Sequence, residues 1–135
     1  MVIDSAHCLR NIHWRESKHC DAPQINIGCD SGQQGVFQCE LIVLHCVSLP
    51  AGEFGSGLPS QLFTGTLDIG AHESFASLAG VRVAPHLFID RDGVVQQFVP
   101  FDRPAWHAGE SQWMNRQGCN RFSLGIELEG TWESP

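Results

Sequence analysis

His45 is the first residue of this sequence whose type and position indicate possible chemistry. It directly follows the apolar run Leu41–Leu44, and this places an imidazole at the predicted C-terminal edge of a buried strand. Open α/β sheets usually bind their ligands at that edge. An imidazole there can bind a metal ion, but a histidine at a strand end is more often a hydrogen-bonded structural residue. Both interpretations of His45 stay open at this point.

Glu127 lies on the polar side of a second predicted strand, Phe122–Leu128, in which apolar and polar residues alternate. Gly125 precedes it by two residues on the same side, so a bulky group or a ligand can approach the backbone there. A carboxylate that faces a cleft can act as a general base. The alternative is that Glu127 and Glu129 simply face solvent on a half-exposed strand.

Trp106 and His107 stand next to the small residues Ala108 and Gly109, inside a long predicted loop that spans residues 101–118. An aromatic ring beside an imidazole suits stacking on a sugar or gripping a peptide. The same residues could equally cover the core beneath the loop.

The other histidines and the cysteines give weaker signals. Six cysteines without a C-x-x-C pair indicate reduced, mostly buried thiols. We expect His72 on the exposed side of a short helix and His86 as a satisfied histidine within a strand. A zinc site near the N-terminus is not favoured, because the spacing there fits no usual ligand pattern. The residues concerned are His7, Cys8, His13, His19 and Cys20.

Composition limits the class of protein. A chain of 135 residues with 42% hydrophobic residues predicts one domain with one core. The net charge of −7 argues against nucleic acid and membrane surfaces as partners. The first residues lack the basic start and apolar run of a secretory signal, and no later stretch approaches a membrane span. We therefore expect a cytoplasmic protein.

The elements that position these residues follow from the hydrophobic pattern. Residues 1–35 are polar and irregular and predict a lead-in on the domain surface, and residues 36–135 form the domain. Within the domain, residues 36–44 predict a central strand that is covered on both faces. The prolines and glycines of residues 48–57 predict a loop.

The second half of the domain predicts a helix and a hairpin before the last strand. Asp68 can cap a short helix across Ala71–Ala79, with one face packed on the sheet. Val83–Ile89 and Val94–Val99 are β-rich runs joined by an Asp-Gly turn, which predicts a β-hairpin. Together the elements indicate a single α/β domain with a mixed sheet.

Several of these segments, in this order, resemble the AmpD family of N-acetylmuramoyl-L-alanine amidases, which act in peptidoglycan recycling. No single string is decisive, but the joint pattern covers nearly all of the chain from Ser17 onward. The matching stretches are Ser17–Pro23, Leu41–His45 with Ser48–Gly55, Leu62–Asp68, Val83–Gly93, Val99–Asp102 with Ala105–Gly109, and Cys119–Asn120 with Ser123–Gly130.

The resemblance implies a fold, a reaction and a set of site residues. The implied fold is a mixed central sheet flanked by helices, shared with phage lysozyme-type amidases and peptidoglycan recognition proteins. The implied reaction is hydrolysis of the amide between (anhydro-)N-acetylmuramic acid and L-alanine in muropeptides, with Zn²⁺ as cofactor. His45 is implied as a zinc ligand, Glu127 as the catalytic carboxylate, and Trp106 and His107 as residues that line the substrate cleft.

The sequence departs from the family pattern at its C-terminal side. The resemblance places two further zinc ligands, a histidine and an aspartate, and a lysine downstream of Gly130, whereas the sequence stops at Pro135. We therefore expect a domain without its C-terminal helix and ligand loop, with apolar surface left exposed. We also expect these 135 residues alone to lack amidase activity and tight zinc binding, since catalytic zinc needs three protein ligands.

Two other functions stay open at this stage. The main alternative is a non-catalytic module that binds peptidoglycan fragments. A cysteine-based metal or redox protein is the third, and in this sequence Cys46 stands beside His45 where the family commonly has asparagine.

Overall fold

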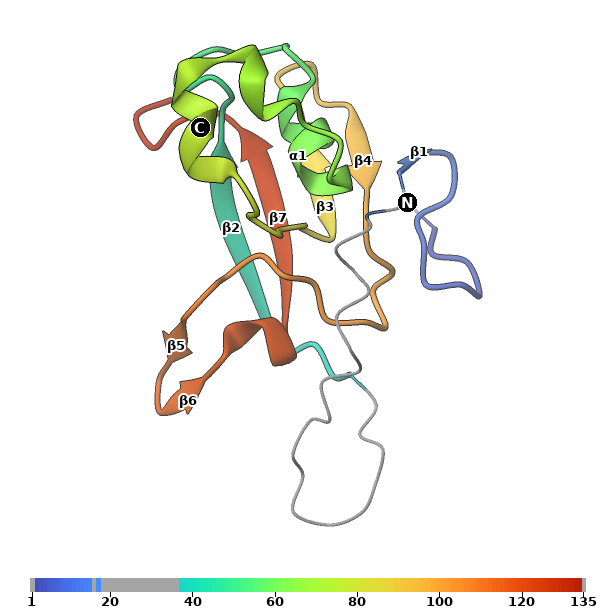
Figure 1. Ribbon diagram of the computed structural model, residues 1–135. Coiled ribbons are helices and arrows are strands. Elements are labelled where there is room, and N and C mark those ends of the chain that lie inside the picture. The colour runs from blue at the N-terminus through green and yellow to red at the C-terminus, as the bar shows by residue number, and fades with distance from the viewer. Residues whose placement is uncertain (1, 16, 18–36, 135) are drawn as a thin grey trace.

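The main sheet of the molecule is mixed, as the sequence predicted. In the computed structural model, which describes residues 2–15, 17 and 37–134, it has five strands in the order β1-β4-β3-β7-β2 (Figure 1). β7 pairs in parallel with both β2 and β3, β4 is antiparallel to β3, and β1 is parallel to β4. In chain order the strands are β1 (His13–Trp14), β2 (Leu41–Val47), β3 (Leu87–Ile89), β4 (Val95–Gln97) and β7 (Ser123–Glu129).

β2 lies at the edge of the sheet, so the prediction of a central strand covered on both faces is wrong. Its residues alternate between partly buried and exposed, and Ile42 and Leu44 are 59% and 65% exposed. The apolar run predicted two covered faces because apolar residues occupy consecutive positions. Sequence pattern alone does not say whether an element packs on each face, and only one face of β2 is covered by described elements.

β7 is the inner strand between β3 and β2, and its polar side is the more deeply buried one. Ser123 is fully buried and Glu129 is 3% exposed, whereas Leu124, Ile126 and Leu128 are only partly buried. The predicted alternation is confirmed. The alternative in which the two glutamates face solvent is wrong, because the elements that cover the sheet pack on this side.

Helix α1 (Leu58–Thr64) packs on the same side of the sheet, and the sequence analysis did not predict it. Gly57 precedes it with a positive φ of 70°, Pro59 lies in its first turn, and Gly65 ends it in the left-handed conformation. Residues 48–57 form the loop that the sequence predicted, and α1 begins directly after it. The core beneath α1 contains Leu62, Phe63, Ala84, Phe88, Phe98, Val99 and Ala105.

The helix expected across Ala71–Ala79 is instead two short 3₁₀ helices, η2 (Ile69–Ala71) and η3 (Glu73–Leu78). The Asp68 carboxylate caps η2 by accepting from Gly70 N at 2.9 Å, as predicted. The extended backbone of His72 separates the two helices, and its ring accepts from Ser74 N at 3.2 Å. His72 is exposed as expected, and Phe75 is the fully buried contact to the core.

The hairpin prediction is confirmed, with shorter strands than expected. β3 and β4 pair through Ile89 and Val95, and Gly93 has a positive φ of 79° in the connecting turn. The Asp90 carboxylate accepts from Val94 N at 2.8 Å and from Asp92 N at 3.0 Å. Asp90 thus holds the turn from its own side chain.

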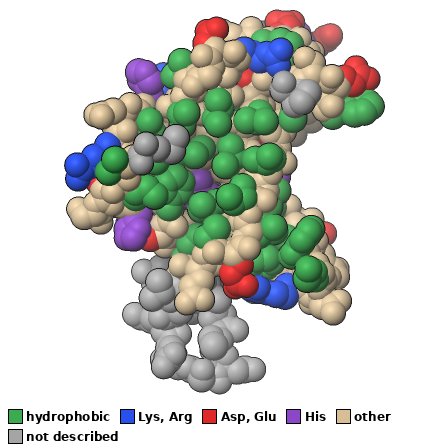
Figure 2. Space-filling model, turned by 180° about the vertical axis from the view of Figure 1, so that it is seen from behind, with side chains coloured by type: hydrophobic (Ala, Val, Ile, Leu, Met, Phe, Trp, Pro, Cys, Tyr) green, Lys and Arg blue, Asp and Glu red, His purple; other side chains and the backbone are tan. Residues whose placement is uncertain are grey.

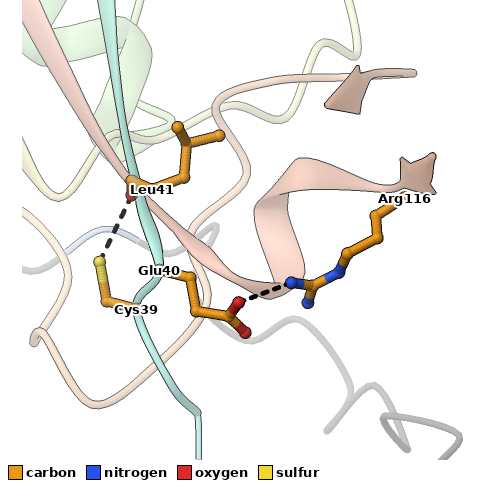
Figure 3. A network of polar contacts seen from close by, with 4 residues as sticks. All are labelled: Cys39, Glu40, Leu41 and Arg116. Atoms are coloured by element: carbon orange, nitrogen blue, oxygen red, sulfur yellow. Dashed lines mark hydrogen bonds and ion pairs between the residues drawn. The ribbon is translucent and has the colours of Figure 1, made fainter. Parts of the chain in front are cut away.

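The long loop between β4 and β7 is mostly irregular, as predicted, but it includes a small hairpin of β5 (Gln112–Trp113) and β6 (Arg116–Gln117). Arg116 connects this hairpin to the start of β2 through an ion pair with Glu40 at 2.7 Å (Figure 3). The Arg116 guanidinium also lies 3.9 Å from the centre of the Phe122 ring. Both charged side chains are about half exposed, so the ion pair alone stabilises by at most about 1 kcal/mol.

The segment of residues 1–35 is less irregular than predicted where it is described. β1 adds an edge strand to the sheet, and Leu9 is buried, with its backbone N–H donating to Gln97 Oε1 at 2.7 Å. The division of the chain at residue 36 stays a prediction. His19 and Cys20 of the disfavoured N-terminal zinc cluster lie outside the described residues.

The opposite face of the sheet carries exposed apolar side chains. Hydrophobic residues gather broadly on the molecule when it is seen from behind (Figure 2). On this face of the β2–β7 strand pair, the exposed Ile42, Leu44 and Cys46 of β2 lie beside the partly buried Leu124 and Ile126 of β7. Exposed apolar surface was expected from the sequence. We call this the apolar face.

Four cysteines lie within the described residues, and all are free thiols. The prediction that the cysteines are mostly buried is wrong for these four, because only Cys119 is buried while Cys39 and Cys46 are exposed. Cys20 and Cys29 lie outside the described residues. None of the helices in the described part of the chain has the length and apolarity needed to span a membrane.

Candidate active site

His45 and Glu127 lie side by side on the covered face of the sheet. They are register partners across the parallel pair β2–β7, and paired residues of neighbouring strands point to the same face. His45 is partly buried, and burial lowers the pKa of its imidazole. The sequence predicted each residue separately. The strand pairing brings them together from 82 positions apart in the sequence.

The Glu127 carboxylate is largely buried, and no positive charge or hydrogen bond among the described residues offsets its loss of hydration. Its Oε2 atom is buried and has no hydrogen-bond partner among the described residues. Burial raises the pKa of Glu127 from 4.5 to about 7, because the charged carboxylate loses its hydration. A carboxyl group with such a pKa can exchange protons near neutral pH, as a general acid and base requires.

His107 lies directly against His45. Its Nδ1 is 2.9 Å from Nε2 of His45, and the two rings meet edge to face. The side chain is only 9% exposed, and burial, followed by the neighbouring His45 and His86, lowers its pKa to about 4. Its predicted role in lining a substrate cleft stays a prediction.

Asn120 and Ser123, which the sequence analysis did not select, hold His107 in place together with Gly125, where it expected a bulky group to approach the backbone. Asn120 Oδ1 accepts from the backbone N–H groups of His107 and Ala108, at 3.1 and 2.9 Å. Ser123 Oγ lies 3.2 Å from His107 Nε2. A Cβ atom on Gly125 would lie 2.2 Å from Cγ of His107, so only glycine leaves room for the ring.

His86 is the satisfied core histidine that the sequence predicted, although it lies just before β3 instead of within it. It is fully buried; its Nδ1 accepts from Gly125 N at 3.0 Å, and its Nε2 donates to the Arg103 carbonyl at 2.8 Å. Burial lowers its pKa to about 4. His86 therefore joins β7 to the loop that leads to Trp106 as a neutral hydrogen-bonding side chain.

Glu129 serves the loop that follows β2. Its carboxylate accepts from the backbone N–H groups of Gly55 at 2.7 Å and Arg91 at 3.2 Å. The Arg91 guanidinium also lies 4.8 Å from the centre of the Phe54 ring. These contacts fix the loop of residues 48–57 against the β3–β4 turn, next to the site.

Trp106 is 38% exposed, and its carbonyl accepts from Ala84 N at 2.9 Å. The loop that follows His107 lines an open hollow of about 670 Å³, whose walls are about equally polar and apolar. Trp106 is available for contact with a ligand, and its predicted role stays a prediction. The hollow is lined by Gly109, Glu110, Ser111, Gln112, Gln117, Gly118 and Arg121.

A metal centre needs more ligands than the described residues of this site bring together. His45 has the chemistry of a zinc ligand, and the orphaned oxygen of Glu127 beside it lacks a positive partner. Within residues 2–15, 17 and 37–134, however, no three His, Cys, Asp or Glu side chains gather as a metal centre would need. They therefore do not complete a three-ligand zinc site.

The fold and this site define a class of α/β domain in which an imidazole and a buried carboxylate are paired on the face of a mixed sheet. The solved structure of a mutant endolysin from Bacillus subtilis shares the fold, with a TM-score of 0.52 at 17% identity, over 94% of this chain and 66% of that one. The crystal structure of a selenomethionine derivative of AmpD is more similar. Its TM-score is 0.81 at 43% identity, over 97% of this chain and 67% of that one.

Sequence comparison leads to a family. The family described as N-acetylmuramoyl-L-alanine amidase matches residues 37–135. The 1,6-anhydro-N-acetylmuramyl-L-alanine amidase AmpD of Escherichia coli is 57% identical over 91 residues, which are 67% of this chain and 50% of that protein. The protein of the same name from Haemophilus influenzae is 45% identical over 95 residues, 70% of this chain and 52% of that protein.

The chain belongs to the N-acetylmuramoyl-L-alanine amidase family, as its sequence predicted. It spans about half the length of the curated relatives that it matches.

Proposed function

We propose that this chain carries the His45–Glu127 part of an amidase site that hydrolyses the amide between anhydro-N-acetylmuramic acid and L-alanine in muropeptides. The observation that supports it most is the cross-strand pairing of His45 with a carboxylate whose pKa is about 7. The relatives that match at 45–57% identity are named for activity on this linkage. Its setting would be cytoplasmic recycling of peptidoglycan.

Glu127 acts as the proton carrier in this proposal. Its carboxylate takes a proton from the attacking water and delivers it to the amine that leaves with L-alanine. Burial on the sheet face keeps the pKa of Glu127 close to neutral, so both transfers are accessible near pH 7. The exposed Trp106 ring is available to stack on the sugar.

Zinc is the cofactor that we propose for the complete site, with His45 as one ligand. The chemistry that zinc would supply there is polarisation of the amide carbonyl and a hydroxide available at neutral pH. Because the described residues do not complete a three-ligand centre, we expect the 135 residues alone to bind zinc weakly and to release no peptide.

The test uses the protein expressed from its natural reading frame, supplied with zinc and an anhydro-N-acetylmuramyl tripeptide. Mass spectrometry measures release of the free tripeptide, and metal analysis measures bound zinc. We expect His45→Ala to lose both zinc and activity. Glu127→Gln should keep zinc and lose activity about 10²- to 10⁴-fold. His72→Ala is the matched control, because His72 is an exposed histidine whose hydrogen bonds go to Ser74 and not to His45 or Glu127.

Full activity of His45→Ala would contradict the proposal.

The second candidate function is a module that binds peptidoglycan fragments without catalysis, which is favoured by the absence of a three-ligand metal cluster among the described residues. Calorimetry with the anhydro-N-acetylmuramyl tripeptide distinguishes the amidase from the binding module. Binding without tripeptide release, in the naturally expressed protein loaded with zinc, would favour the binding module.

A further inference from the structure

A chain of hydrogen bonds begins at a backbone carbonyl and ends at His45. The hydroxyl of Ser123 donates to the carbonyl oxygen of Cys119 at 2.6 Å. A carbonyl oxygen only accepts, so the single hydroxyl proton of Ser123 is committed to this bond. Ser123 Oγ, which also contacts Nε2 of His107 at 3.2 Å, can then only accept from that nitrogen. The proton of His107 therefore lies on Nε2.

The tautomer of His107 follows from this. Its ring is buried between His45 and His86, where a positive charge would lose hydration and face two further imidazoles, so the ring is neutral. A neutral imidazole carries one N–H group and one bare nitrogen. With the proton on Nε2, the Nδ1 atom of His107 is bare and accepts a hydrogen bond. Its partner at 2.9 Å, Nε2 of His45, must then be the donor.

We propose that Ser123 and His107 are positioning residues that fix the tautomer and ring orientation of His45, so that its proton lies on Nε2 and its Nδ1 is the nitrogen left free for a ligand. The Cys119 carbonyl fixes the hydroxyl proton of Ser123, Ser123 then fixes the tautomer of His107, and His107 fixes that of His45. His107 then serves His45 instead of contacting the substrate. This inference rests on the proposed function only for the identity of the ligand that His45 receives.

The backbone around His107 is built to hold this geometry. Asn120 anchors the N–H groups of His107 and Ala108 through one side-chain oxygen. Gly125 leaves the space that the ring fills, because a Cβ there would lie within 2.5 Å of three of its ring atoms. A ring fixed on both its backbone and its edge loses little further entropy when it orients a neighbour.

The experiment is nuclear magnetic resonance of the ¹⁵N-labelled 135-residue chain at pH 7, with a chelator and without substrate. Long-range ¹H–¹⁵N correlation assigns the tautomer of each histidine. We expect the proton between the two rings to show its one-bond coupling to Nε2 of His45 and a coupling across the hydrogen bond to Nδ1 of His107. Attachment of that proton to Nδ1 of His107 would overturn the proposal.

Ser123→Ala removes the oxygen that accepts the hydrogen bond from Nε2 of His107 and so keeps the His107 proton on that nitrogen. We expect its ring signals to shift, the proton between the rings to move toward His107, and the coupling across the hydrogen bond to weaken or vanish. Ser123→Thr keeps the hydroxyl and should keep the wild-type tautomers. Ser60→Ala is the control, because Ser60 is also buried and hydrogen-bonded, through Gln96.

Unchanged tautomers of both histidines in Ser123→Ala would overturn the role of Ser123. If that variant does not fold, the wild-type proton position decides the matter. The readout requires neither metal nor turnover. A failed amidase assay therefore leaves this inference standing, and a wrong tautomer leaves the proposed activity standing.

Discussion

The two faces of the β2–β7 strand pair use the same backbone for opposite purposes. One face holds the polar residues His45, Glu127 and Ser123 and is covered by the core elements and His107. The apolar face presents Ile42 and Leu44 with more than half of each side chain exposed, at 59% and 65%. The usual relation between polarity and exposure is therefore reversed across this sheet.

Each face of the strand pair therefore carries a cost in folding free energy. Burial of an unpartnered carboxylate costs free energy, and so does exposure of large apolar side chains. The first cost lies at the candidate site, where the raised pKa of Glu127 would serve the proton transfer that we propose. The second lies on a face for which the described elements provide no cover. Four substitutions test how differently the faces respond.

The largest effect is expected on the covered face from Phe88→Ala. Phe88 is 2% exposed, packs against the Phe63 ring at 5.9 Å and is the register partner of Glu127. We expect the free energy of unfolding to fall by about 3–5 kcal/mol. Urea denaturation measures it. The matched change on the apolar face, Leu44→Ala, should cost far less, and equal losses would break the comparison.

The next effect concerns pH and Glu127. The folded protein binds the Glu127 proton more tightly than the unfolded chain, since the pKa rises from 4.5 to about 7. The contribution of Glu127 to stability is therefore complete below pH 4.5 and is lost as pH rises through about 7. The loss is on the order of 3 kcal/mol at most.

His86 and His107, whose pKa values are lowered to about 4, change stability in the opposite sense, so wild type and Glu127→Gln are compared at each pH. Metal-free urea denaturation from pH 4 to 8 provides the difference. We expect Glu127→Gln to gain stability relative to wild type as pH rises. A difference that does not vary with pH would show that Glu127 is not destabilised by burial.

Gly125→Ala should have an intermediate effect. Its Cβ would overlap the His107 ring at 2.2 Å, so we expect a loss of about 1–3 kcal/mol in unfolding free energy. The His45–His107 hydrogen bond should be lost in the same variant, as ¹H–¹⁵N spectra would report. Gly70→Ala serves as control, since its Cβ meets only the Asp68 carboxylate at 3.3 Å. Wild-type stability and spectra for Gly125→Ala would refute the packing argument.

The smallest effect on stability is expected on the apolar face. Leu44→Lys should change the unfolding free energy by no more than about 0.5 kcal/mol, because the side chain is already mostly in water. It should nevertheless reduce self-association in sedimentation velocity, since it interrupts an exposed apolar surface. Gln112→Lys adds the same charge at another exposed position. If both variants associate equally, the apolar face does not drive association.

Local patterns in the sequence were sufficient for the family, the mixed sheet, the β3–β4 hairpin and the alternation of β7. Each depends on residues that are close in the chain, such as the turn residues Asp90 and Gly93. Helix α1 was missed because it begins directly at the end of the predicted loop of residues 48–57, although Gly57 and Pro59 are typical of a helix start. The edge position of β2 was missed because the continuous apolar run Leu41–Leu44 does not say which elements cover each face of the strand.

The sequence by itself determined which residues could do chemistry, His45 and Glu127 among them, since their type and strand position are local properties. Only the tertiary structure decided that Glu127 Oε2 is buried with no hydrogen-bond partner among the described residues. It also decided that His107 contacts His45 and that Ser123 contacts His107. Those facts depend on strand register and on a contact between residues 62 positions apart. No local pattern encodes such a contact, because it exists only when separate segments pack on one sheet face.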